Sequence, residues 1–165
     1  MASFDTRFAF EASKKFEVAL DRYSTDCTEI AKEAIYEGAK IVADEMKNEI
    51  NKIPRDRYRY LKKDEKYNVA PEGEKKDLKE SFGITKMKED MMSWNVKIGF
   101  DGYGKYKTKK YPNGVPNQLI ARAIESGSSV RGKYPFVRNT IKRKKREVVK
   151  KMDDVIEKET MLIFK

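Results

Sequence analysis

The residue types that most often carry enzymatic chemistry are scarce in this sequence. Histidine is absent and Cys27 is the only cysteine, which excludes Ser-His-Asp and Cys-His catalysis, imidazole zinc sites and thiolate metal clusters. The adjacent carboxylates Glu89-Asp90 and Asp153-Asp154 stand among polar residues, not in the apolar surroundings typical of a catalytic acid. We therefore expect no enzymatic activity, no cofactor and no metal.

Basic and aromatic side chains are mixed in two stretches without regular periodicity, 55–76 and 101–114. Such a mixture can bind a nucleic-acid backbone through its charges and stack on bases through its rings. A flexible, solvated loop has the same composition, so both interpretations stay open. The candidate contacts to a partner protein or to DNA are Arg55, Arg57, Arg59, Lys105, Lys107, Lys109 and Lys110.

Positive charge dominates the chain but is distributed unevenly. The formal net charge is +10, of which residues 1–50 contribute −4 and residues 51–165 contribute +14. A basic majority favours a polyanionic partner, such as nucleic acid, an acidic protein surface or an anionic membrane. A lysine-rich, solvated surface is the alternative. The same two readings apply to KRKKR at 142–146, which resembles a nucleic-acid patch.

The composition limits the size of the core. Of the 165 residues, 39% are hydrophobic and 39% are charged, so the core is thin for the length. The longest apolar run, 161–164, is far shorter than the roughly 20 residues of a membrane span. Residues 1–15 show no apolar signal-peptide core. We expect no association with a membrane.

Hydrophobic spacing predicts the elements of the N-terminal third. Phe4, Phe8 and Phe10 alternate with polar residues, which predicts a short strand over 4–10. A short helix is expected from Ser13 to Tyr23. Apolar and small residues recurring at three and four positions predict a long helix over 24–51, ending before Pro54.

The middle of the chain predicts loops and a hairpin. Residues 55–76 read as a long loop and 77–82 as a short turn. Strand candidates at 84–91 and 94–100 predict an antiparallel hairpin within a three- or four-stranded sheet. Residues 101–114 read as a second long loop. Both loops lack the apolar residues that offset ordering entropy, so we expect them to be mobile in an isolated subunit.

Two helices are predicted in the C-terminal third. Pro116 begins a helix that ends at Gly127, a residue that tolerates left-handed geometry. Pro135 begins the last helix in the tolerated first-turn position. We predict that Phe136 is buried against Ile120, Ile124 or the sheet.

The charged residues on either side of the turn between these helices are also expected to meet. We predict that Glu125 pairs with Arg138 or with a backbone donor, which would fix the angle between the two helices.

Several segments together resemble one protein family. They are WNVKIGF at 94–100, VPNQLIARAIESG at 115–127, YPFVRNT at 134–140, DLKESF at 77–82, and the helix at 24–51 with its KIP exit. In this order they resemble the tail-component family of long-tailed bacteriophages, also called the head–tail joining, neck or tail-completion family of Hong Kong-type phages. Ser126 and Asn139 depart from the family's aromatic residue and second proline.

The resemblance implies a fold and a function. The fold is α+β, with a long N-terminal helix and a C-terminal helix packed on a small antiparallel sheet. Residues 1–23 then form an arm or the start of the domain, and 24–165 form a single domain with long loops at 55–76 and 101–114. The motif residues are Glu125, Gly127, Pro135, Phe136 and Arg138.

The function implied is that of a structural virion protein made in the bacterial host cytoplasm. It would form a homo-oligomeric ring at the head–tail connector or tail terminus, and its partners would be neighbouring head-completion and tail proteins. Contact with DNA would be non-specific. The alternative function is that of a basic nucleic-acid-binding protein.

Overall fold

A computed structural model describes residues 26–57, 59, 61–90 and 93–163. The predicted strand at 4–10 and the predicted short helix from Ser13 to Tyr23 lie outside the described residues. The described part of the chain has an α+β fold, in which two long helices accompany small antiparallel sheets.

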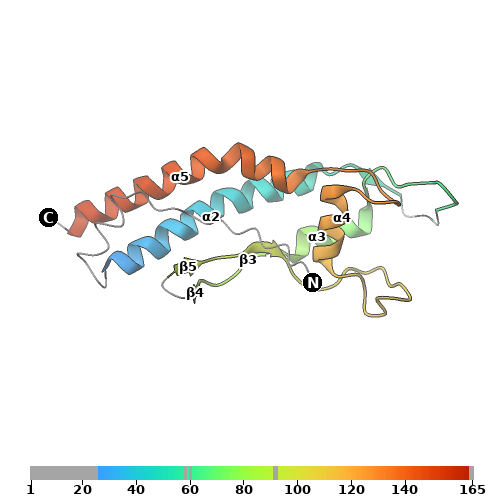
Figure 1. The fold of residues 1–165 in the computed structure, drawn as a ribbon, viewed down its shortest axis with the longest axis horizontal. Coiled ribbons are helices and arrows are strands. Elements are labelled where there is room, and N and C mark those ends of the chain that lie inside the picture. Colours follow the sequence, from blue (N-terminus) through green and yellow to red (C-terminus); the bar gives the residue numbers. More distant parts are fainter. Residues whose placement is uncertain (1–25, 58, 60, 91–92, 164–165) are drawn as a thin grey trace.

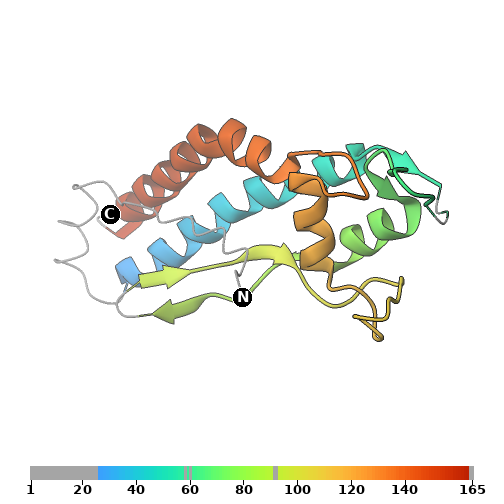
Figure 2. The same ribbon diagram turned by 45° about the vertical axis from the view of Figure 1, so that its right-hand side comes forward.

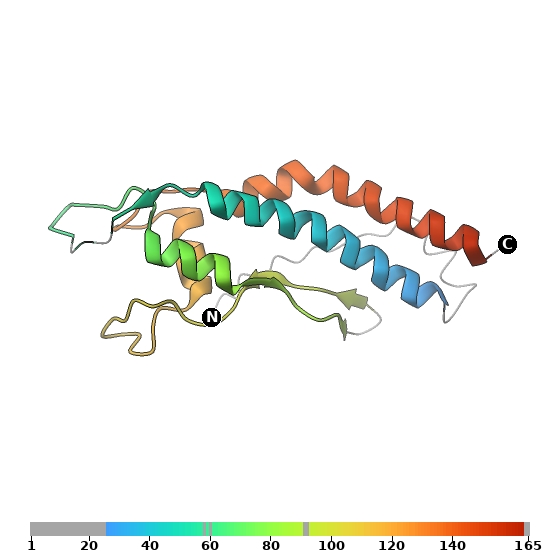
Figure 3. The same cartoon turned by 180° about the vertical axis from the view of Figure 1, so that it is seen from behind.

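The two long helices lie side by side and run in opposite directions (Figures 1 and 3). Helix α2 spans Asp26–Lys52 and helix α5 spans Phe136–Ile163, which confirms both helices predicted from periodicity. They approach closely at Gly38, where an added Cβ would lie 2.9 Å from Met152 Sδ. Small residues on one face of α2 therefore allow the helices to pack, and most of the contacts of α5 are with α2.

An antiparallel ribbon lies below α2 in Figure 1 and follows part of its length. Strand β3 (Phe82–Ile84) pairs with β6 (Ile98–Phe100), and β4 (Lys88–Asp90) pairs with β5 (Ser93–Asn95). The hydroxyl of Tyr36 on α2 accepts the N–H of Met87 at 2.7 Å and so holds the middle of the ribbon. The predicted hairpin is confirmed.

The predicted three- or four-stranded sheet is wrong for the described residues, because their antiparallel strands pair only two by two. The hydroxyl of Thr85 accepts the N–H of Lys97 at 2.9 Å between the two strand pairs. Every residue of β4 is exposed, so this strand has no apolar face to bury against a third neighbour.

Two short helices and a pair of very short strands form the opposite end of the molecule from the C-terminal end of α5 (Figure 2). They are α3 (Glu72–Ser81), α4 (Asn117–Ser126), β1 (Arg55–Asp56) and β2 (Ala70–Pro71). Strands β1 and β2 pair in parallel. Helix α4 lies between Pro116 and Gly127, as predicted.

Helix α3 corrects two predictions, the turn at 77–82 and the loop extending to residue 76. Pro71 precedes the helix, and Glu72 and Glu74 occupy its first turn, where acidic side chains stabilise the helix dipole. Leu78 is fully buried. The segment EGEKKDLKES contains one large apolar residue, so it shows no helical periodicity from which a helix could be predicted.

The core is concentrated where α3, α4 and the start of α5 meet the end of α2. The largest fully buried apolar side chains are Ile50, Ile53, Leu78, Ile124 and Phe136. Phe136 packs edge-on against Phe100 of β6, with ring centroids 6.2 Å apart, and this confirms the prediction that Phe136 is buried against the sheet. The core thus supports the end of the molecule that carries the basic loops.

Candidate functional site

The two basic stretches project from the same end of the molecule (Figures 1 and 2). One follows β1 and returns through β2, and the other connects β6 to α4. We call residues 57–69 the first loop and 101–114 the second loop. All seven residues that the sequence indicated as candidate contacts lie on these loops or on β1.

The base of the first loop is fixed by Asp56. Its carboxylate accepts the N–H of Asn68 at 3.0 Å, the N–H of Arg57 at 2.8 Å and Nη1 of Arg59 at 3.0 Å. The hydrogen bonds from Asn68 and Arg59 lower the pKa of Asp56 below its ordinary value. Arg59 also lies over the ring of Tyr67, 5.4 Å from its centroid. Arg59 therefore helps to close the loop.

The first loop is not the purely polar segment that its composition predicted. Tyr67, Val69 and Ala70 are buried, and Tyr67 bridges to Arg131 in the turn before α5. The expected lack of apolar anchoring is therefore wrong for residues 67–71. The physical reason is that a few well-spaced apolar residues suffice once another segment covers them.

Asp77 and Asn117 fix the base of the second loop. The buried Asp77 carboxylate accepts the N–H of Lys105 at 2.7 Å, and the side-chain amide of Asn117 donates to the Asp101 carbonyl at 2.8 Å. Gly104 has to be small here, because a Cβ would lie 2.9 Å from Ile120 Cδ1. Beyond this base, Lys107, Lys109 and Lys110 are exposed, and Lys110 lies over the ring of Tyr111.

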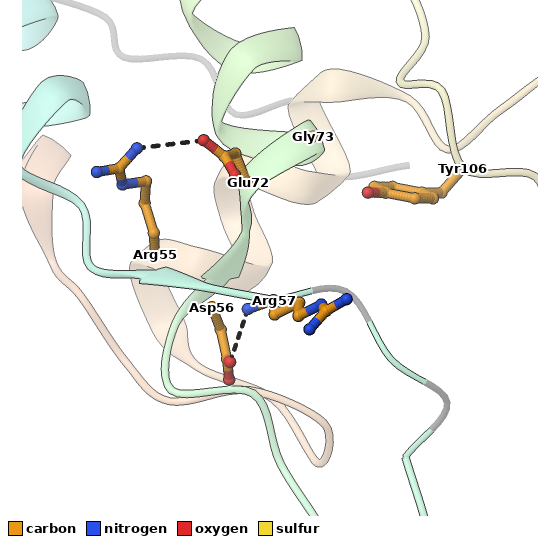
Figure 4. A pocket seen from close by; sticks show the side chains of 6 residues that line it. All are labelled: Arg55, Asp56, Arg57, Glu72, Gly73 and Tyr106. Atoms are coloured by element: carbon orange, nitrogen blue, oxygen red, sulfur yellow. Dashed lines mark hydrogen bonds and ion pairs between the residues drawn. The ribbon is translucent and has the colours of Figure 1, made fainter.

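A pocket of about 720 Å³ joins the two loops, lined by Arg55, Asp56, Arg57, Glu72, Gly73 and Tyr106. Figure 4 shows Arg55 turned toward Glu72, with which it forms an ion pair at 3.2 Å, while Arg57 extends in the other direction. Within the described residues, no ion-pair partner of Arg57 is present. The pocket therefore combines an available guanidinium with the aromatic ring of Tyr106, an arrangement suited to an anionic surface.

Sequence reasoning missed a buried ion pair behind this pocket. Glu74 on α3 and Arg131 in the turn before α5 form a two-pronged pair, with Nη2 to Oε1 at 3.1 Å. Both side chains are only 10% exposed. Their separation of 57 positions gave no sequence signal, because an ion pair between segments has no characteristic spacing.

Lys75 is a second residue that the sequence did not indicate. Its ammonium donates to the carbonyls of Asn51 and Ile53 at 2.6 and 2.9 Å, and so it satisfies the C-terminal end of α2. Burial lowers the pKa of Lys75, and repulsion from Arg55 adds to this effect. Lys75 thus links α3 to α2 directly beneath the loops.

The predicted motif residues form a joint between α4 and α5. The buried carboxylate of Glu125 accepts the N–H groups of Val137 and Arg138 at 2.9 and 3.2 Å. The side chain of Arg138 is 69% exposed, with Nε 3.9 Å from Glu125. The predicted contact of Glu125 with a backbone donor or Arg138 is therefore observed, and the backbone bonds are its main part.

Gly127 and Pro135 complete this joint. Gly127 ends α4 with φ 74° and ψ 168°, a conformation that is essentially restricted to glycine. Pro135 immediately precedes α5, which begins one residue later than predicted, and the Pro135 carbonyl accepts the N–H of Asn139 at 3.2 Å. The chain can therefore reverse between α4 and α5 within nine residues.

The basic run KRKKR has a structural part and an exposed part. Arg143 donates to Glu45 and Glu49 of α2 at 2.6 and 3.0 Å, and Lys144 forms an ion pair with Glu45. Lys142, Lys145 and Arg146 are exposed. This run thus holds α5 to α2 and leaves three charges for solvent or a partner.

In the described residues, no group of three or more His, Cys, Asp or Glu side chains is placed to hold a metal ion. None of the helices described combines the length and apolar character needed to span a bilayer.

In comparisons with known proteins, no family model, curated protein or solved structure matches this chain.

Proposed function

We propose that this chain is a structural, non-enzymatic virion protein of a bacteriophage head–tail connector, neck or tail terminus. It is made in the bacterial host cytoplasm and assembles there as a ring of identical copies that joins capsid to tail. Its partners are copies of itself and neighbouring head-completion and tail proteins.

The observation that carries this proposal is the meeting of the segments on which the resemblance rests. Segments 94–100, 115–127 and 134–140 lie far apart in sequence or are separated by turns. Phe100 contacts Phe136, and Glu125 bonds the backbone at Val137 and Arg138. These motifs thus meet in one place, at the joint between α4 and α5, and this supports a shared fold with the family.

The surface of the subunit also suits assembly. Exposed apolar side chains remain at Tyr103, Val130, Met161 and Leu162. The basic loops are held at their bases by Asp56 and Asp77 and present their charged tips at one end. A subunit that covers such surfaces with copies of itself can have a small core of its own.

The mass of the purified full chain in solution, measured by sedimentation at several concentrations without nucleic acid, tests the proposal. The expected result is a closed oligomer of one defined size that forms cooperatively as concentration rises. A monomer at every concentration up to about 1 mM, where even an association of only about −4 kcal/mol begins to appear, would contradict it.

Nucleic-acid binding is the second candidate function. The observation that favours it is the convergence of both basic loops on one pocket, with Arg57 and Tyr106 in its lining. Because DNA passes through a connector, this function is compatible with the first, and the salt dependence of DNA binding separates them.

A further inference from the structure

Helix α5 carries charged side chains along the side that faces away from α2. Its residues Val148 and Met152 turn toward α2, where they lie against Gly38. The helix forms one long edge of the molecule (Figures 1 and 3). Residues four apart share a helix face, and seven residues span about two turns. At these intervals stand four exposed charged residues, which we call the α5 stripe: Lys142, Arg146, Asp153 and Glu157.

The α5 stripe is basic in its first half and acidic in its second. Lys142 and Arg146 are like-charged neighbours four residues apart, and so are Asp153 and Glu157. Like charges at this spacing destabilise an isolated helix. Among the described residues, the ion pairs made by α5 involve none of these four side chains. The matching partner therefore presents the two signs in the reversed order along the helix.

A second copy of α5 that runs antiparallel has this reversed order. In such a pair, Lys142 of one copy faces Glu157 of the other, and Arg146 faces Asp153. Both pairings occur in one register, because both are centred on the same point between Val149 and Lys150. A two-fold axis through this point repeats each pairing, as in other isologous interfaces. The stripe is thus complementary to itself.

We propose that two copies of this chain associate through the α5 stripe, antiparallel about a two-fold axis between Val149 and Lys150. Val149 is half-buried and provides an apolar contact at the centre. The two copies of Lys150 lie near the axis and repel each other. Because an exposed ion pair contributes little by itself, the association is reversible, with a Kd on the order of 10–100 µM at low salt.

Sedimentation of the full chain, with variants that reverse the charge of one half of the stripe, tests the proposal. Lys142→Glu with Arg146→Glu makes the whole stripe acidic. Asp153→Lys with Glu157→Lys makes it basic. Each variant alone should dimerise at least about tenfold more weakly than the wild type, because like charges then face each other. A mixture of the two should regain the wild-type affinity, and an unchanged Kd in both single variants would overturn the proposal.

A chain with all four changes tests the antiparallel register. Two positive and two negative charges are exchanged, so the net charge stays at +10. This swapped chain should pair with itself as the wild type does, but it should not pair with the wild type, because equal charges would then meet. Isotope labelling of one chain makes a mixed dimer visible in native mass spectrometry. Mixed dimers would overturn the antiparallel arrangement, since parallel helices would place opposite charges side by side.

A matched control separates the stripe from total charge. Lys107→Glu with Lys109→Glu, at exposed positions on the second loop, changes the net charge as much as the acidic stripe variant does. Dimerisation should be unchanged in this control. An equal weakening would show that the association depends on net charge and would overturn the proposal. The swapped chain provides the test if a half-stripe variant fails to fold in a circular-dichroism melt.

The inference goes beyond the proposed ring and does not depend on it. A ring needs a head-to-tail contact, whereas the contact through α5 is two-fold. A wild-type protein that stops at a dimer would support the α5 contact and count against the ring. A ring whose mass no stripe variant changes would support the proposed function and overturn the α5 contact.

Discussion

Glu125 is the residue on which the joint between α4 and α5 depends. The residue is 2% exposed, and its carboxylate accepts two N–H groups in the first turn of α5 that have no partner within the helix. The negative charge also lies at the positive end of the α5 dipole. A side chain of one helix thus serves as the N-terminal cap of the next.

We expect Glu125→Ala to lower the free energy of unfolding by about 1–3 kcal/mol, because two buried backbone donors lose their acceptor. Arg138→Ala should cost less than about 0.5 kcal/mol, since its side chain is mostly exposed. Urea unfolding of both variants measures the difference. If Arg138→Ala were as damaging as Glu125→Ala, the exposed ion pair and not the cap would hold the joint.

Glu49 makes the contact between α2 and α5 sensitive to pH. Burial acts to raise the pKa of its carboxyl, but the hydrogen bonds from Lys52 and Arg143 outweigh burial, and the pKa lies below its ordinary value. In the unfolded chain a glutamate titrates near pH 4.3. The stabilisation from the charged form is therefore complete above that pH and is lost as the pH falls through the folded-state pKa.

The variant Glu49→Gln cannot titrate, so between about pH 5 and pH 3 it should lose less stability than the wild type loses. Thermal melts across this pH range measure how steeply the melting temperature of each protein falls as the pH is lowered. Glu80→Gln, at an exposed position on α3, should keep the wild-type slope. Parallel curves for the wild type and Glu49→Gln would show that the ion pairs of Glu49 do not contribute to acid sensitivity.

Among the elements, α5 connects to the ribbon through its first residue. Phe136 is 1% exposed and packs edge-on against Phe100 of β6. We predict that Phe136→Ala destabilises the protein by roughly 3–5 kcal/mol through lost burial and the cavity left behind. Chemical denaturation measures this loss, and a value below about 1 kcal/mol would show that the side chain is peripheral.

The long helices were predictable because the spacing of their apolar residues is a local pattern that repeats along the sequence. Apolar side chains recur along α2 and α5, and proline or glycine marks the ends of α4 and the start of α5. Helix α3 was missed because one buried leucine, Leu78, and dipole-compatible charges stabilise it. Its stability depends on tertiary contact, which no window of sequence contains.

In the candidate site too, some residues could be predicted from the sequence and others could not. Composition identified Arg55, Arg57, Arg59 and the lysines of the second loop, and the structure places them at one end. Composition could not identify the carboxylates of Asp56 and Asp77, which accept backbone N–H groups of the loops. A hydrogen bond from a side chain to a distant backbone leaves no pattern in composition or spacing.

As a whole molecule, the protein is elongated, with a helical pair along its length and basic loops at one end (Figure 1). Arg55 and Arg59 are engaged in ion pairs, whereas Lys107, Lys109 and Lys110 are exposed. Among the residues that the structure describes, no ion-pair partner of these three lysines is present. Such a surface attracts any polyanion. The salt dependence and the sequence specificity of binding distinguish DNA from an acidic protein as the partner.

Salt titration of DNA binding makes this distinction. We expect the wild type to bind DNA weakly and without sequence preference, with a Kd no tighter than roughly 10⁻⁴–10⁻⁶ M at physiological salt. Replacing Lys107, Lys109 and Lys110 by alanine should weaken binding about as much as replacing Lys142, Lys145 and Arg146 on α5, which removes equal charge. Equal losses follow because non-specific attraction depends on charge and not on a built site.

A dedicated DNA-binding surface would give a different result. Binding would be nanomolar and sequence-dependent, the loop variant alone would abolish it, and the slope of log K against log salt would fall by about 0.9 for each phosphate that the variant no longer neutralises. The triple change of Arg55, Arg57 and Arg59 to alanine is less specific, because Arg59 bonds Asp56 at the base of its loop. Loss of binding in the lysine variant, with the α5 variant unaffected, would therefore favour nucleic-acid binding over contact with an acidic protein surface as the role of these loops.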